Sequence, residues 1–200
     1  MILSVVCPAH MDRFPAAIMG QIDEQAKRAN ISNGSPVVEF ICLLDNGPLS
    51  TGEKMNRLYE MANGDYVSAV GDDDLVSPDY VATLVRAIVE NPGVDIVSFD
   101  HTYYVNGEFN ALTAVSKDFK DAQTEGLHHR CPTPKCAIRR EICLKFRCPD
   151  ISDKEDQSMS EWLVGRLHSE VRIERPIYTH TWNRENKKWR QGQSKMWRRG

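Results

Sequence analysis

Residues 66–78, Tyr66-Val-Ser-Ala-Val-Gly-Asp-Asp-Asp-Leu-Val-Ser-Pro78, decide the fold prediction because they join an apolar run to a helix start. The run at 66–70 is typical of a buried strand, and three consecutive Asp residues, 72–74, follow closely. Ser77 then favours an N-cap, with Pro78 at the first helical position. Adjacent carboxylates repel one another unless a cation lies beside them. The stretch therefore predicts a cation-binding turn between a strand and a helix.

The same alternation of strand and helix patterns surrounds this stretch. Apolar runs at 2–6, 37–44 and 94–99 have the length of buried strands. Helices are expected after the first two runs, beginning near Asp12 and at a capping box over 50–53. Strands that alternate with helices in this way form a mostly parallel sheet with helices on both faces. We therefore predict an α/β fold.

The second half of the chain has weaker patterns. The Asn106-Gly107 pair predicts a small antiparallel hairpin over 102–112, because both residues accept the positive φ angles of a type I′ turn. Residues 113–135 show no clear period and are expected to form a long loop. A capping box at 152–155 predicts a further helix, and 171–182 is expected to be the last strand.

Length and composition favour a single domain, since the chain has 200 residues of which 41% are hydrophobic. The domain is expected over residues 1–182, followed by a basic tail at 183–200. No window approaches the roughly 18 apolar residues of a membrane span, and residues 1–6 lack the basic leader of a signal peptide, so a cytoplasmic location is expected. These patterns leave the oligomeric state undetermined.

A cluster of cysteines has two interpretations. Four cysteines lie in one segment beside two histidines: Cys131, Cys136, Cys143, Cys148, His128 and His129. A structural zinc site is one interpretation, and with the basic tail it would suit a nucleic-acid-binding protein. The other is free thiols in the core, which the spacing favours because it differs from the usual C-x2-C of zinc sites.

Carboxylates are expected at one edge of the predicted sheet. Asp45 and the triplet at 72–74 each follow a strand, and ligands of open α/β sheets bind at the carboxyl ends of the strands. Mn²⁺ and Mg²⁺ prefer carboxylate oxygens and take their other ligands from water and phosphates. The alternative is that the acids only favour the helix dipole and are solvated. We expect a Mn²⁺ or Mg²⁺ site here.

Two segments carry a family resemblance: ANGDYVSAVGDDDLVSPDYV over 62–81 and DISDKEDQSMSEWL over 150–163. They resemble the GT-A glycosyltransferases, in particular the large inverting family 2. The matching positions are Ala62, Gly64, Asp65, Tyr66, Val67, Asp73, Asp74 and Pro78. The resemblance implies one GT-A, Rossmann-like domain, with a nucleotide-sugar-binding half at 1–100 and an acceptor half at 101–182.

The resemblance also implies roles for individual residues. The implied donor-binding residues are Pro8, Ala9, His10, Arg13, Asp45 and Asp72. The implied metal ligands are Asp72, Asp73, Asp74 and His180. Glu155 and Asp156 are the implied catalytic pair, with Asp156 as the base that takes the acceptor proton; helix capping is the other role open to Glu155. The implied reaction is metal-dependent, inverting transfer of a sugar from a nucleoside diphosphate, expected to be UDP, to an acceptor hydroxyl.

The function, the acceptor and the basic tail each have more than one interpretation. Gly71 stands where the family motif has its first acid, so a degenerate GT-A domain that binds a nucleotide sugar or glycan without turnover is the alternative function. The acceptor is expected to be a glycan or a modified base in DNA. The basic tail, which includes Trp189 and Trp197, suits the donor diphosphate, an anionic acceptor or a merely solvated terminus.

Overall fold

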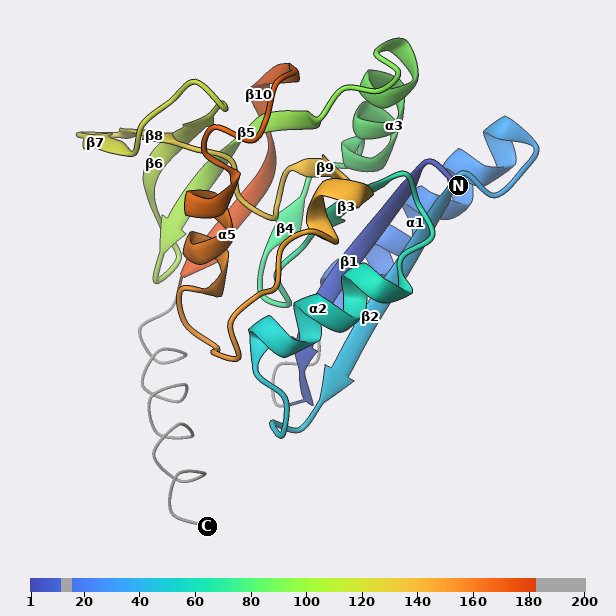
Figure 1. Cartoon of the computed structure of the whole chain (residues 1–200), viewed down its shortest axis with the longest axis horizontal. Helices are drawn as coiled ribbons and strands as arrows, with labels where there is room; N and C mark the ends of the chain where they lie inside the picture. The colour runs from blue at the N-terminus through green and yellow to red at the C-terminus, as the bar shows by residue number, and fades with distance from the viewer. Residues whose placement is uncertain (12–15, 183–200) are drawn as a thin grey trace.

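Three parallel strands form one side of the sheet in the computed structural model, which describes residues 1–11 and 16–182. β1 (Leu3–His10) lies between β2 (Val38–Asp45) and β3 (Tyr66–Ala69) and pairs in parallel with both. All three predicted strands are confirmed, and β1 continues four residues beyond the apolar run at 2–6 to reach His10. Their carboxyl ends therefore meet at one edge of the sheet (Figure 1).

Helices cover both faces of this sheet, as predicted. α1 (Ala16–Asn33) and α3 (Tyr80–Glu90) share an apolar core with one face, and α2 (Thr51–Met61) packs on the other. The first core contains Ile18, Ile22, Tyr80 and Leu84 packed against alternate residues of β1. Alternation along β1 sends neighbouring side chains to opposite cores, because the side-chain period of a strand is two.

The helix starts test the two predicted capping signals of the first half. Ser50 accepts a hydrogen bond of 3.0 Å from the backbone N–H of Glu53, so the N-cap of α2 is confirmed. Ser77 as the N-cap of α3 is wrong, because α3 begins at Tyr80. The Ser77 N–H instead donates to the carbonyl of Ile177, which extends the pairing of β4 (Leu75–Val76) with the last strand and holds this backbone extended.

The hairpin prediction is confirmed and the loop prediction beside it is wrong. β5 (Ile96–Val105) is one continuous strand, and Asn106 and Gly107 join it to β6 (Glu108–Val115) with φ angles of 51° and 85°. The segment 113–135 contains the end of β6 and two short strands, β7 (Ala122–Thr124) and β8 (Leu127–Arg130). Strands of three and four residues are too short to show a period in sequence.

The sheet is completed by two strands of very different length. β9 (Ala137–Arg139) lies between β3 and β5, antiparallel to both, and continues into α4 (Arg140–Cys143). β10 (Glu170–Trp182), the predicted last strand, pairs in parallel with β5. The full order is β2-β1-β3-β9-β5-β6-β8-β7, with β10 and β4 off this path. The sheet is thus mostly parallel near the predicted site and mixed elsewhere.

α5 (Glu155–Leu163) begins two residues later than position 153, the start that the capping box at 152–155 predicted. Lys154 precedes it with a φ of 70°. The hydroxyl of Ser152 accepts a hydrogen bond of 3.1 Å from the N–H of Thr51, so it serves the start of α2 instead. The capping pattern is present in the sequence, but Ser152 makes a long-range hydrogen bond to Thr51 and does not cap α5.

The cysteine segment packs into the second core. Cys136, Cys143 and Cys148 are buried and Cys131 is half-buried, all as free thiols. Within residues 1–11 and 16–182, no three His, Cys, Asp or Glu side chains are placed to hold a metal ion, so the zinc interpretation has no support there. The described part of the chain also has no helix long and apolar enough to cross a membrane. The basic tail at 183–200 lies outside the described residues.

Candidate functional site

A buried lysine connects the carboxyl ends of β1 and β2. Lys54 lies in the first turn of α2 and is only 4% exposed. Its Nζ donates a hydrogen bond of 2.6 Å to the carbonyl of Ala9 and forms an ion pair with Asp45. The other oxygen of Asp45 accepts a hydrogen bond of 2.9 Å from the N–H of Leu49. The Asp45 carboxylate is therefore fixed in place against the end of β1.

The same contacts keep Asp45 ionised. Burial acts to raise the pKa of this carboxyl, but the hydrogen bond and charge of Lys54 and the backbone N–H groups of Leu49 and Gly47 outweigh it, and the net pKa is lowered. Asp45 is thus a fixed negative charge and hydrogen-bond acceptor at neutral pH, which suits recognition of a donor group on a ligand.

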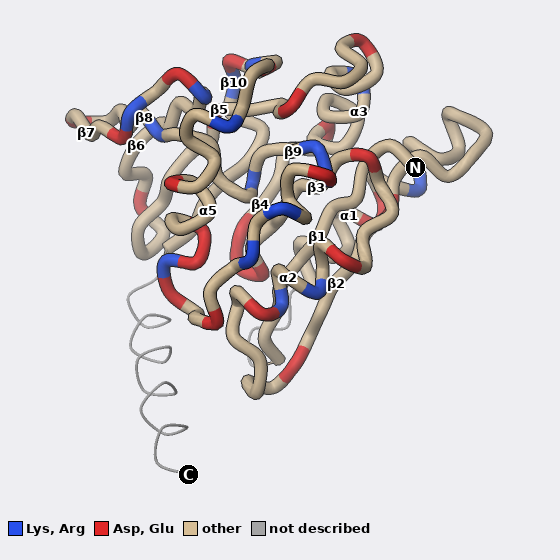
Figure 2. Tube along the Cα trace, in the orientation of Figure 1, with Lys and Arg blue, Asp and Glu red and all other residues tan. Residues whose placement is uncertain are grey.

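A second link connects β1 to the Asp triplet. The N–H of His10 donates a hydrogen bond of 3.1 Å to Oδ2 of Asp72. A continuous chain of contacts therefore runs from Asp45 through Lys54 and the end of β1 to Asp72, across the ends of three neighbouring strands. Asp72 and Asp73 are half-buried, and the triplet directly precedes β4, where Figure 2 shows a cluster of acidic residues.

The third carboxylate of the triplet faces β10. Asp74 is 3% exposed, and its oxygens accept hydrogen bonds from the Tyr178 hydroxyl at 2.5 Å and the Thr181 N–H at 2.8 Å. Nδ1 of His180 lies 3.0 Å from Oδ1 of the same carboxylate. Burial acts to raise the pKa of Asp74, but His180, the charge of Lys135 and Tyr178 lower it to about 2. Asp74 therefore fastens the triplet to β10.

Gly71 is required by the close approach of Asp74. A Cβ at position 71 would lie 2.5 Å from Oδ2 and 2.9 Å from Cγ of Asp74, distances at which one group must move. The N–H of Gly71 also donates a hydrogen bond of 2.9 Å to the Tyr178 hydroxyl. The missing first acid of the motif is thus explained by packing, since the Asp74 carboxylate covers the space that a side chain would need.

His180 is held between Asp74 and two rings on β5. The Tyr103 ring stacks on it at 5.2 Å with an interplanar angle of 12°, and the His101 ring lies edge-on at 6.4 Å. Burial, followed by the charge of Lys135, holds the pKa of His101 well below its usual value, so His101 is neutral. A histidine whose Nδ1 bonds a carboxylate has its Nε2 left for a ligand, which is the usual arrangement of metal-bound histidines.

The predicted metal ligands have side chains of the right chemical type for a divalent ion, but the described structure does not gather three of them into one site. Of the four predicted ligands, Asp74 already uses both carboxylate oxygens in contacts with Tyr178, His180 and Thr181. The other three are Asp72, Asp73 and His180. Mg²⁺-type sites use one or two carboxylates and complete their shell with water and phosphate oxygens. An ion at this position would therefore need water or diphosphate oxygens beside one or two of these side chains.

The predicted catalytic pair lies at the start of α5. Glu155 is half-buried, and its charge raises the pKa of Tyr59 and Cys148, after the larger effect of burial on both. Asp156 is exposed, and its Oδ1 accepts a hydrogen bond of 2.8 Å from the N–H of Gln157. No contact between described residues joins Asp156 to the Asp triplet.

The segment before α5 is nevertheless held at the edge that carries the site. The N–H of Gly52 donates to the carbonyl of Ile151 at 3.0 Å, and Asn56 exchanges hydrogen bonds with the backbone of Cys148. Because α2 starts just beyond the end of β2, these bonds place the approach to α5 beside that strand end. Of the remaining predicted residues, Pro8 lies in β1, and Arg13 is outside the described residues.

Two residues of the site have no place among the sequence predictions. The sequence does contain a sign that Lys54 has a partner. A cation in the first turn of a helix is repelled by the positive end of the helix dipole and so needs a local partner. Tyr178 has no such sign in the sequence, since an aromatic residue in a strand is ordinary core composition. Its role depends on the pairing of β10 with β4 and β5, which only the folded chain reveals.

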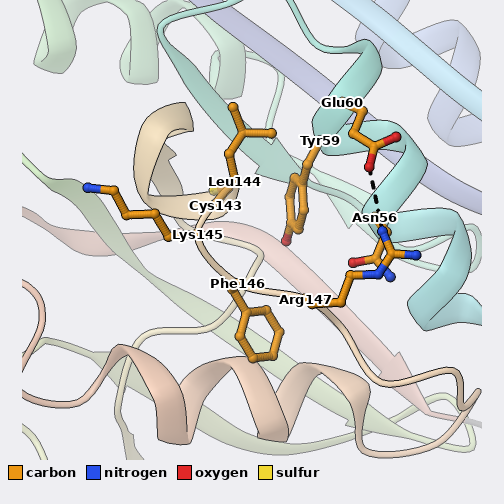
Figure 3. A pocket seen from close by; sticks show the side chains of 8 residues that line it. All are labelled: Asn56, Tyr59, Glu60, Cys143, Leu144, Lys145, Phe146 and Arg147. Atoms are coloured by element: carbon orange, nitrogen blue, oxygen red, sulfur yellow. Dashed lines mark hydrogen bonds and ion pairs between the residues drawn. The ribbon is translucent and has the colours of Figure 1, made fainter.

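Two hollows of the described structure lie away from the predicted site residues. A cavity of about 110 Å³ is lined by the second half of α2 and residues 143–147, with Arg147 3.5 Å from Glu60 at its rim (Figure 3). A groove of about 410 Å³ runs between α1 and α3. Neither is lined by a predicted site residue.

Comparison with known proteins agrees with the fold. Residues 42–146, just over half of the chain, match the family model described as glycosyl transferase family 2. Residues 1–349 of Staphylococcus aureus TarS in complex with UDP are similar in structure, with a TM-score of 0.63 and 14% identity over 95% of this chain and 63% of that one. No curated protein matches the sequence. The matched segment contains Asp45 near its first residue, and it contains the whole Asp triplet at 72–74.

A second solved structure has the same fold. Glucosyl-3-phosphoglycerate synthase from Mycobacterium tuberculosis, in complex with Mn²⁺, UDP-glucose and phosphoglyceric acid, gives a TM-score of 0.57 and 14% identity over 94% of this chain and 74% of that one. At such identities the likeness concerns the fold. The chain spans less than two thirds of the TarS fragment, so that protein has structure with no counterpart here.

Proposed function

The chain belongs to glycosyl transferase family 2, and from that premise we propose that it transfers a sugar from a nucleoside diphosphate sugar to an acceptor hydroxyl, with a divalent metal and with inversion. The observation that carries the proposal is the chain of contacts from Asp45 through Lys54 and His10 to Asp72. These contacts hold Asp45 and Asp72 at neighbouring strand ends, where Asp45 would serve the nucleoside and the acidic triplet would serve a metal. Ligands of α/β sheets bind at this edge.

The donor would lie across the ends of β1 and β2. In this proposal Asp45 contacts the nucleoside, Pro8 to His10 line it, and Arg13 and Asp72 act toward the phosphates. UDP is the proposed nucleotide, supported by the similar structures solved with UDP and UDP-glucose. Residues 1–100 would thus form the donor half and 101–182 the acceptor half of the domain.

Asp72, Asp73 and His180 would hold Mn²⁺ or Mg²⁺, with Asp74 keeping His180 in place. When bound, the ion neutralises the diphosphate leaving group as the sugar departs. Asp74 acts in this arrangement as a positioning residue, because its oxygens are already engaged by Tyr178, Thr181 and His180.

Asp156 would remove the proton of the acceptor hydroxyl. Its carboxylate is exposed at the start of α5, where an acceptor approaching the open edge can reach it. Attack on the sugar from the side opposite the diphosphate inverts the anomeric centre. The proposed acceptor is a glycan or a modified base in DNA, since an open edge admits a large molecule.

A thermal-shift screen of nucleotide sugars, with and without Mn²⁺, tests this function. The proposal expects one nucleotide to raise the melting temperature only when the metal is present. A lack of any shift across UDP, GDP, CDP and ADP sugars would contradict it. A domain that binds without turnover would show the shift, but it would release no nucleoside diphosphate that depends on Asp156.

A further inference from the structure

A second lysine lies at the same edge, beside the end of β3. Its backbone position is set by two hydrogen bonds: the Ser68 hydroxyl donates to the carbonyl of Lys135 at 2.5 Å, and the Ala69 N–H donates to the carbonyl of Pro134 at 2.9 Å. Because Ala69 is the last residue of β3, Lys135 is anchored two residues before the turn that begins at Gly71.

The ammonium of Lys135 lies over the ring of Tyr178, the residue that anchors Asp74. Nζ of Lys135 lies 5.9 Å from the centre of the Tyr178 ring, and the hydroxyl of that ring bonds Asp74. Burial raises the pKa of Asp74, and the charge of Lys135 helps to lower it, after the larger effect of His180. Burial lowers the pKa of His101, and the charge of Lys135 lowers it further. The ammonium therefore lies close to the proposed metal ligands on the side of β9 and β10.

The two lysines of this edge differ in how their charges are used. Lys54 is neutralised by Asp45 and bonded to the carbonyl of Ala9. Within residues 1–11 and 16–182, Nζ of Lys135 has no carboxylate at ion-pair distance, and its only recorded contact is the Tyr178 ring. A half-buried lysine on an anchored loop, whose ammonium forms no ion pair with a described carboxylate, is suited to an anionic ligand.

We propose that Lys135 binds the diphosphate of the donor and so shares the leaving-group charge with the metal. This assignment rests on the proposed function and adds a residue to it. The diphosphate of a nucleotide sugar carries two negative charges and gains a third as it leaves, and a fixed ammonium stabilises this charge without reorganisation as it develops. Lys135 would therefore matter for the phosphates and not for the nucleoside.

Titration calorimetry with Mn²⁺ present, using pyrophosphate, UDP and uridine as probes, tests this assignment. Lys135→Met is expected to weaken pyrophosphate and UDP binding roughly 10- to 100-fold, the range for one hydrogen bond to a charged group, and to leave uridine binding unchanged. Lys135→Arg should restore most of the loss. Lys145→Met, at an exposed lysine beside the cavity behind α2, is the matched control and should bind all three like the wild type.

Three results would overturn the assignment. One is equal pyrophosphate affinity in Lys135→Met and the wild type. Another is a parallel loss of uridine binding, which would indicate a structural role. The third is a wild type that binds neither pyrophosphate nor UDP with Mn²⁺, and this result alone would also remove the proposed function. Melting temperatures of the variants, measured alongside, verify that each is folded.

Discussion

The hydroxyl of Tyr178 donates a hydrogen bond of 2.5 Å to Asp74, and the same oxygen accepts one of 2.9 Å from the N–H of Gly71. One phenol on β10 thus holds both ends of the turn that carries the Asp triplet. Burial and the nearby Asp74 charge keep the pKa of Tyr178 well above its usual value, so the hydroxyl stays protonated and able to donate. The geometry of the triplet depends on the last strand of the sheet.

Gly71→Ala is expected to destabilise the protein by about 1–3 kcal/mol, because the new methyl group collides with the Asp74 carboxylate. Urea denaturation measures the change. Gly20→Ala is the matched control: nothing lies within 4 Å of a Cβ at position 20 in α1, and the same substitution should stabilise by about 0.5–1 kcal/mol. Equal effects at the two glycines would refute the packing explanation for Gly71.

Asp74 is expected to add about 2 kcal/mol of stability at neutral pH, from the fall of its pKa from 3.8 to about 2 on folding. The folded-state pKa is the lower one, so this contribution is complete above about pH 4 and is lost as the pH falls toward 2. Asp74→Asn should therefore differ from the wild type most at pH 7 and least near pH 2. Denaturation curves across this pH range measure the difference, with the exposed Asp65→Asn as control. A difference in unfolding free energy between Asp74→Asn and the wild type that does not change with pH would contradict this prediction.

Lys54→Met should destabilise the fold by about 3–5 kcal/mol, because it leaves the Asp45 carboxylate and the Ala9 carbonyl without their cation. Chemical denaturation measures the loss, and donor affinity should fall with it. Lys27→Met removes an exposed ion pair with Asp23 in α1 and is expected to change stability by less than about 1 kcal/mol. A Lys54 variant as stable as the Lys27 variant would show that the contact chain is not rigid.

Asp156→Asn should lower the rate of nucleoside diphosphate release about 100-fold or more while leaving stability within about 0.5 kcal/mol. The reason is that the carboxylate is exposed and its one recorded contact is with the next residue. Glu161→Gln, at an exposed acid of the same helix, should retain full activity. Full activity in Asp156→Asn would assign the base to another group.

Local patterns predicted the part of the fold that positions the donor site. The apolar runs of β1, β2 and β3, the cap at Ser50 and the Asn106-Gly107 turn depend on neighbours in sequence, and all five are confirmed. Long-range pairing decided what was missed. β9 depends on both of its partner strands, and Ser77 is drawn into the pairing of β4 with β10.

The candidate site divides in the same way. Carboxylates at strand ends were visible in the sequence because the residue type and its place in the pattern suffice. Which carboxylate is anchored was not, since the burial of Asp74 follows from Tyr178 and Thr181, more than 100 residues later. The use of Lys54 likewise depends on the approach of α2 to the end of β1.

The central claim is that a metal and a nucleoside diphosphate sugar bind together at the carboxyl ends of β1, β2 and β3. Titration of the wild type and Asp72→Asn with UDP-glucose and UDP-GlcNAc, each with Mn²⁺ and with EDTA, measures this most directly. We predict that the wild type binds one of these sugars only with Mn²⁺, and that Asp72→Asn remains folded but loses this metal-dependent binding. Binding that is the same in EDTA, or unchanged in Asp72→Asn, would contradict the account.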